Sequence, residues 1–70
     1  YQRQGMWAMA VAQYRAAVAA APNRAEYYKS LGIGYNKLGR TERALKTFEQ
    51  AARLDPADLE VMALLKKLRE

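Results

Sequence analysis

The sequence predicts an all-α fold of antiparallel helix hairpins, and three features of its 70 residues indicate this class. Apolar residues recur at spacings of three and four in four segments, which is the pattern of a helix with one buried face. The segments are separated by residues that break helices, namely Gly5, Pro22, Gly39 and Pro56. The usual signals of strands, alternating polarity and Asn-Gly or Asp-Gly turns, do not occur.

The first half of the chain predicts two of these helices. Between Gly5 and Pro22, one apolar face contains Trp7, Ala10, Tyr14, Ala17 and Val18. Asn23 suits the N-cap of the second helix, because Glu26 stands three residues later and completes a capping box. The apolar face of this second helix contains Tyr28, Leu31, Gly32, Tyr35 and Leu38. We expect Gly39 to end it in a left-handed conformation.

The second half predicts two more helices. Thr41 is the expected N-cap of the third, whose inner face contains Ala44, Leu45, Phe48, Ala51 and Ala52. Its outer face has opposite charges four residues apart, which support a helix when they pair: Glu42 with Lys46, and Glu49 with Arg53. Asp55 and Pro56 are expected to begin the fourth helix, whose apolar stripe contains Val61, Met62, Leu65 and Leu68.

The helix breakers and the apolar positions repeat with a period of 34 residues. This spacing separates five pairs: Gly5 and Gly39, Pro22 and Pro56, Ala10 and Ala44, Tyr14 and Phe48, and Ala17 and Ala51. A period of 34 residues that contains two helices is typical of the tetratricopeptide repeat. The sequence resembles that family in two motifs, Tyr28-x2-Leu31-Gly32-x2-Tyr35 and Ala44-x3-Phe48 followed by Ala51 and Pro56.

The resemblance implies how the chain is organised. Residues 23–56 are expected to form one complete repeat, in which the small Gly32 and Ala44 let the two helices approach closely. Residues 1–22 are expected to be the end of a preceding repeat, with its turn at Gly5. Residues 57–70 are expected to be a capping helix, because Lys66 and Arg69 stand where the repeat has a glycine and an aromatic residue. We also expect the chain to be a segment of a longer protein.

Composition narrows the functions. The chain has 12 Lys and Arg against 7 Asp and Glu, a net charge of +5, and neither His nor Cys. An imidazole base, a thiolate nucleophile and the commonest metal ligands are thus missing, so we expect no enzyme, no cofactor and no metal. No apolar run is long enough to predict membrane insertion. The net charge keeps nucleic acid as an alternative partner, but the basic residues are scattered over several helix faces, which disfavours it.

The resemblance further implies protein–protein interaction, because the first helices of such repeats line a concave groove that holds peptides. By helical phase, the groove residues are expected to be Gln2, Arg3, Lys29, Ile33, Asn36 and Lys37. Cationic and amide groups of this kind suit a carboxylate-bearing or acidic peptide.

Self-assembly is a second hypothesis. The segment before Pro22 has many large apolar residues for an incomplete repeat, and an exposed apolar surface often marks an interface. The expected interface with another copy of the chain contains Met6, Trp7, Met9 and Val11.

Overall fold

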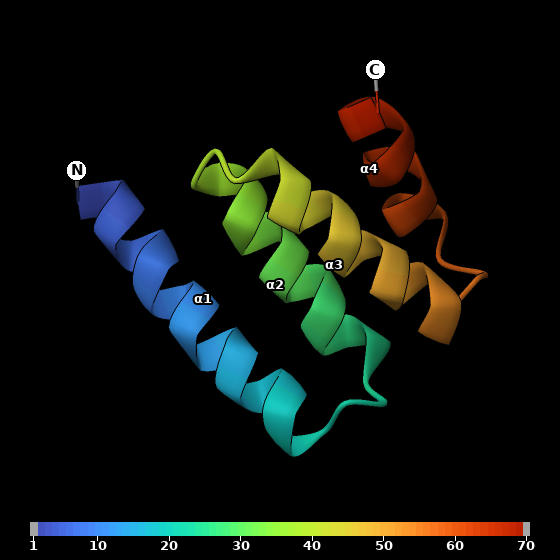
Figure 1. Cartoon of the computed structure of the whole chain (residues 1–70), viewed down its shortest axis with the longest axis horizontal. Coiled ribbons are helices and arrows are strands. Elements are labelled where there is room, and N and C mark those ends of the chain that lie inside the picture. Colours follow the sequence, from blue (N-terminus) through green and yellow to red (C-terminus); the bar gives the residue numbers. More distant parts are fainter. Residues whose placement is uncertain (1, 70) are drawn as a thin grey trace.

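The computed structural model describes residues 2–69, and within them four helices follow one another with short turns between them (Figure 1). The helices are α1 (Gln2–Ala20), α2 (Ala25–Lys37), α3 (Thr41–Leu54) and α4 (Leu59–Arg69). Each packs against the next, with successive helices running in opposite directions, so the molecule is a thin slab measuring 34 × 31 × 16 Å. The predicted all-α fold of antiparallel hairpins is confirmed.

The core lies mainly between α2 and α3 and is closed by one face of each outer helix. Its buried residues are Val11, Leu31, Tyr35, Ala44, Phe48, Ala51, Val61 and Leu65. Phe48 has no exposed surface, and its ring lies so close to α2 that a Cβ atom on Gly32 would sit 2.6 Å from its Cε1 atom. The close approach predicted at Gly32 is therefore present, since a larger residue there would collide with the ring.

The turn between α2 and α3 forms as the sequence predicts. Gly39 has a φ angle of +77°, which only glycine adopts without strain. The N–H of Gly39 donates to the carbonyl of Asn36 at 3.0 Å, and the N–H of Arg40 donates to that of Tyr35 at 2.9 Å. These two bonds form a Schellman motif, which satisfies carbonyls at the end of α2.

Gly5 does not form the turn that the sequence predicts 34 residues before Gly39. It lies inside α1, which runs without a break from Gln2 to Ala20. A glycine inside a helix costs about 1 kcal/mol relative to alanine, and the alanine-rich part of α1 that begins at Ala8 offsets this cost. The helix tail expected before Gly5 and the helix expected after it are therefore one helix.

Two expected N-caps are also wrong by one residue. Arg24, not Asn23, precedes the first turn of α2, and it makes no side-chain cap. Glu26, expected to complete a capping box, instead pairs with Arg24 at 3.5 Å. Thr41 is the first residue of α3 and follows Arg40 at the N-cap. The side chains at these positions face solvent, so tertiary packing, not capping, fixes where both helices begin.

The start of α4 and both charge pairs expected on α3 also differ from expectation, and Glu42 and Lys46 form no ion pair in the part of the chain that the structure describes. Asp55 follows the end of α3, where its carboxylate accepts the N–H of Ala57 at 3.3 Å, and α4 begins only at Leu59. On α3, Glu49 does not pair with Arg53 but accepts a 2.9 Å bond from Arg69 of α4. This bond joins α4 to the exposed face of α3.

Candidate functional site

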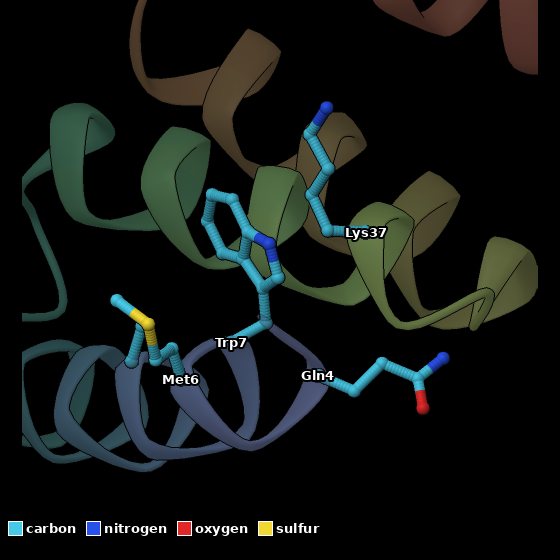
Figure 2. A pocket seen from close by; sticks show the side chains of 5 residues that line it. Gln4, Met6, Trp7 and Lys37 are labelled. Atoms are coloured by element: carbon cyan, nitrogen blue, oxygen red, sulfur yellow. The ribbon is translucent and has the colours of Figure 1, made fainter. Parts of the chain in front are cut away.

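A hollow lies between the first half of α1 and the C-terminal end of α2. It has a volume of about 670 Å³ and is lined by Gln4, Met6, Trp7, Ala10 and Lys37. Figure 2 shows the indole ring of Trp7 reaching from α1 toward α2, with Lys37 projecting from α2 beside it. Met6 and Lys37 are exposed, whereas Trp7 and Ala10 are half-buried, so the hollow is open to solvent above a partly covered apolar floor.

The helix contact beside the hollow explains why it forms. Val11 packs so closely on α2 that a Cβ atom on Gly34 would lie 2.7 Å from its Cγ2 atom. Trp7 lies one turn before Val11 on the same face of α1. Because α1 and α2 are antiparallel, Trp7 meets α2 one turn beyond Gly34, where Lys37 leaves the helix surface. The absence of a side chain at Gly34 thus permits the close contact with Val11, and the Trp7 ring lines the hollow at the next level.

The chemistry of the hollow combines an apolar floor with polar groups at its edge. The Met6 thioether and the Trp7 ring offer polarisable surface that adapts to apolar side chains. The indole N–H, the Lys37 ammonium and the Gln4 amide are hydrogen-bond donors. An arrangement of this kind can accept an apolar side chain that stands next to a carboxylate.

The expected groove residues are divided by the structure. Asn36 and Lys37 are exposed at the end of α2, and Ile33 is half-buried, packing against the core from the same helix. Gln2 and Arg3 belong to α1, and their side chains lie outside the described part of the molecule. Of the four expected groove residues whose side chains are described, only Lys37 lines the hollow, together with two residues that were expected at an interface between copies, Met6 and Trp7.

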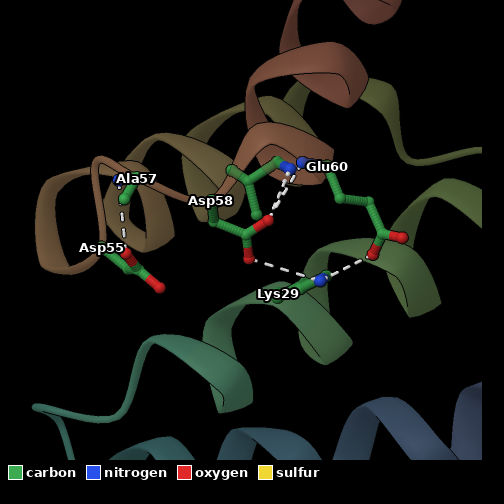
Figure 3. A network of polar contacts seen from close by, with 6 residues as sticks. Lys29, Asp55, Ala57, Asp58 and Glu60 are labelled. Carbon is green, nitrogen blue, oxygen red and sulfur yellow. Dashed lines mark hydrogen bonds and ion pairs between the residues drawn. The ribbon is translucent and has the colours of Figure 1, made fainter.

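Lys29 is engaged by the chain itself. It was expected to face a partner's carboxylate, but its Nζ atom lies 2.6 Å from Glu60 and 3.3 Å from Asp58 (Figure 3). The hydrogen bond to Glu60, opposed by partial burial and reinforced by Asp58, raises the pKa of Lys29. Two acidic groups therefore compensate this positive charge and hold the start of α4 against α2.

Asp58 performs two functions at this junction that the sequence reasoning missed. Its Oδ1 atom accepts the N–H of Glu60 at 3.0 Å and that of Val61 at 3.3 Å, which caps α4 (Figure 3). Partial burial opposes ionisation, but the Val61 N–H and Lys29 outweigh it and lower the pKa of Asp58. The signal in the sequence was an Asp directly before an apolar helix stripe, which the preceding Asp55 and Pro56 obscured.

The comparison with protein families decides what this helix pair is. The model of the tetratricopeptide repeat matches residues 25–58, which span α2, α3 and the turn that leads into α4. Residues 25–58 are a tetratricopeptide repeat. Such repeats are generally protein–protein interaction modules and not catalytic domains. No curated protein shows significant sequence similarity to the chain.

Around the repeat, the residues expected at an interface between copies do not form one surface. The side chains of Met6 and Met9 on α1 are 70% and 67% exposed, and Trp7 is half-buried in the hollow. Val11 is only 7% exposed, because it packs against Gly34 of the repeat. Its place in that interface was therefore wrong: Val11 is a core residue that joins α1 to the repeat.

On the other side of the repeat, α4 presents a shallower surface. A hollow of about 550 Å³ is lined by Met62, Ala63, Leu65, Lys66 and Arg69. Leu59 is 80% exposed at the start of the helix, and the basic residues near its end are exposed as well.

Two further features limit the chemistry of the described residues. No group of three or more acidic side chains within residues 2–69 is placed to hold a metal ion. None of the helices in this part of the chain has the length and apolar character needed to span a bilayer.

Proposed function

We propose that the chain is a non-catalytic protein-interaction module, a scaffold or adaptor segment of a larger protein, that binds an extended peptide of a partner protein. The peptide lies along the face of α2 that carries Ile33, Asn36 and Lys37. The observation that carries this proposal is the hollow at the end of that face, where Trp7 and Met6 offer apolar surface beside Lys37. The match to an interaction repeat at residues 25–58 supports it.

Charge on the α2 face favours one orientation of the peptide. Lys29 is compensated by Asp58 and Glu60, so the start of α2 attracts a carboxylate weakly. Lys37, at the other end, has no ion pair among the described side chains. We therefore expect the peptide to place an apolar side chain in the hollow and an adjacent carboxylate against Lys37.

The packing of the helices favours binding without rearrangement. Val11 and Gly34 fix α1 against α2, and Phe48 and Gly32 fix α2 against α3. A site between helices that are already packed loses little ordering entropy when a peptide docks, which leaves more of the interaction energy for affinity.

Two exposed methionines provide the test. Random dodecapeptides are selected by display against the wild-type chain, and the enriched peptides are measured against Met6→Glu and Met9→Glu. Both variants change the net charge equally, on one helix, at side chains of similar exposure, but only Met6 lines the hollow. We expect Met6→Glu to weaken binding at least about tenfold, since a charge in an apolar site costs more than 1.4 kcal/mol, and Met9→Glu to change it little.

The outcomes separate clearly. Equal binding to wild type and Met6→Glu would remove the hollow from the site. A selection that enriches no peptide would overturn the peptide-binding function. A Lys37→Glu variant that prefers peptides with a basic residue in place of the acidic one would support the proposed orientation.

Self-assembly is a second candidate, favoured by exposed apolar side chains on both outer helices: Met6 and Met9 on α1, and Leu59 and Met62 on α4. One feature opposes pairing of α4 with α1 of another copy in the manner of α2 and α3. Lys66 stands where α2 has Gly32, whose lack of a side chain permits the contact with Phe48. Light scattering over a dilution series decides: a mass above 7.9 kDa that falls on dilution supports assembly, and a constant 7.9 kDa excludes it.

A further inference from the structure

The charged residues of this chain are distributed unequally between the two ends of the helix stack. We define the turn end as the end that holds the α2–α3 turn, the start of α1 and the end of α4, which lie along the upper edge of Figure 1. The opposite end holds the α1–α2 and α3–α4 turns. Each charged residue is assigned by the half of the helix, or the turn, in which it lies.

The turn end is strongly basic. Its positive residues come from every part of the repeat and from α4: Lys37, Arg40, Arg43, Lys46, Lys66, Lys67 and Arg69. All seven are exposed, and the only acidic residue among the described side chains of this end is Glu42. Arg69 is bonded to Glu49, so six of the seven basic groups face solvent without an acidic partner among the described side chains.

The opposite end is close to neutral. It has four basic residues, Arg15, Arg24, Lys29 and Arg53, and five acidic ones, Glu26, Glu49, Asp55, Asp58 and Glu60. Three of these acidic groups are paired within this end, with Arg24 or Lys29. The described side chains thus give the turn end a net charge of +6 and the opposite end −1, and the remaining charged residues of the chain, Arg3 and Glu70, cancel to leave the total of +5.

Apart from Glu49, which lies near the middle of α3 and is bonded to Arg69, the charges of the two ends are far enough apart to act separately on a partner. The 13-residue helix α2 spans about 20 Å, whereas charges in solution are screened over about 8 Å at physiological ionic strength. A partner near the turn end thus meets a positive field that the opposite end does not cancel.

We propose that the turn end is a second contact surface, which binds an acidic stretch of a partner protein. It goes beyond the peptide site in the hollow, because it uses charges on α3 and α4 that the hollow does not contain. A protein is favoured over a nucleic acid because sites for single strands pair basic groups with exposed aromatic rings. Of the aromatic rings described at this end, Tyr35 is buried and Trp7 is half-buried.

The test compares charge reversals at the two ends. The probe is fluorescein-labelled octaglutamate, and its binding is followed by anisotropy at low salt. Lys66→Glu/Lys67→Glu reverses two charges at the turn end, and Arg15→Glu/Arg53→Glu reverses two at the opposite end. Both double variants change the net charge from +5 to +1. Lys66, Lys67 and Arg53 all lie in the last turn of a helix, so the cost to the helix dipole is similar, and circular dichroism checks the fold.

We expect the first variant to weaken octaglutamate binding at least about tenfold and the second to change it less than about threefold, because only the first removes charges near the probe. Equal weakening would show that net charge alone attracts the probe, and no binding by wild type at low salt would also overturn the proposal. Tighter binding of octathymidylate than of octaglutamate would assign the surface to nucleic acid instead. Octaglutamate has no apolar side chain, so this outcome does not depend on whether Met6→Glu affects peptide binding.

Discussion

The helices α1 and α3 are related by the 34-residue period, yet they differ in how far they are buried. On α3, Ala44, Phe48 and Ala51 are 0%, 0% and 1% exposed. Their equivalents on α1, Ala10, Tyr14 and Ala17, are all half-buried. The reason is that α3 lies between α2 and α4, whereas in the described part of the chain α1 makes extensive contacts with α2 only. The repeated pattern selects which face of each helix turns inward, but the number of neighbouring helices decides how much of it is covered.

The largest effect should come from the matched ring residues of the two helices. Phe48→Ala removes a fully buried ring and should cost about 3–5 kcal/mol of unfolding free energy. Tyr14→Ala should cost less than half as much, because part of that ring is already in contact with water. Urea denaturation followed by circular dichroism measures both. Equal losses of unfolding free energy would mean that the inner face of α1 is covered as fully as that of α3, which would contradict the difference in burial.

Two glycines of α2, one facing α3 and one facing α1, should also differ in the cost of adding a side chain. A Cβ atom at position 32 would meet the enclosed ring of Phe48, so Gly32→Ala should cost about 1–3 kcal/mol. At position 34 the new methyl group would meet the Cγ2 atom of Val11, on a helix that no other described element holds from the far side. Since α1 can shift outward, Gly34→Ala should cost less. A greater loss for Gly34→Ala, measured in urea, would contradict this.

Gly5 and Gly39 occupy the same position in the period but differ in conformation. Gly39→Ala should destabilise the fold by about 1 kcal/mol or more, because alanine is strained at a φ angle of +77°. Gly5→Ala should stabilise it by about 0.5–1 kcal/mol, since Gly5 lies inside α1 and a Cβ atom there meets nothing within 4 Å. Thermal melts of both variants provide the measurement. A lower melting temperature for Gly5→Ala would indicate a turn at that position.

The smallest expected effect on stability concerns α4. Unlike α1, this helix is joined to α2 by ion pairs between described side chains. Because the pKa of Asp58 is lowered, its contribution is present above the ordinary value of 3.8 and is lost as pH falls through the folded-state pKa below it. Because the pKa of Lys29 is raised, its contribution is present below 10.5 and is lost as pH rises past the raised value. Asp58→Asn removes the charge that pairs with Lys29 but keeps the cap, because Asn also caps helices. It should therefore lower stability only slightly at neutral pH.

The difference between Asp58→Asn and wild type should vanish in acid, where Asp58 is protonated in both the folded and the unfolded chain. Urea midpoints at neutral pH and at a pH well below 3.8 test this. A difference that is unchanged in acid would mean that the charge of Asp58 does not stabilise the junction.

The sequence alone predicted the structure correctly where a residue type allows only one conformation or one contact. Gly39 at a left-handed turn and Gly32 against Phe48 are of this kind, and so is the period that predicted the repeat. It was insufficient where several residues compete for one role. Asn23, Thr41 and Asp55 are all good caps, but the helices begin where tertiary contacts place them, and Asp58 provides the cap that α4 uses.

The candidate site was harder to predict because it depends on how neighbouring helices meet. Helical phase assigned Asn36 and Lys37 to a groove; both are exposed at the end of α2, and their part in a groove stays a prediction. It did not show that Lys29 reaches Asp58 and Glu60 at the start of α4, because these two residues are 29 and 31 positions further along the chain. Nor did it show that Val11 packs against Gly34 in the core, or that Trp7 lines a hollow beside Lys37.

The most direct test of the proposed peptide site uses the single tryptophan of the chain, which lines the hollow. Peptides without tryptophan, taken from the display selection, are titrated into the wild-type chain while the emission of Trp7 is recorded. Calorimetry on the same samples shows independently when binding is saturated. We expect a saturable shift of the emission to shorter wavelength, because a bound apolar side chain removes water from the half-buried indole. Saturated binding without any change in Trp7 emission would place the peptide elsewhere and contradict the proposed site.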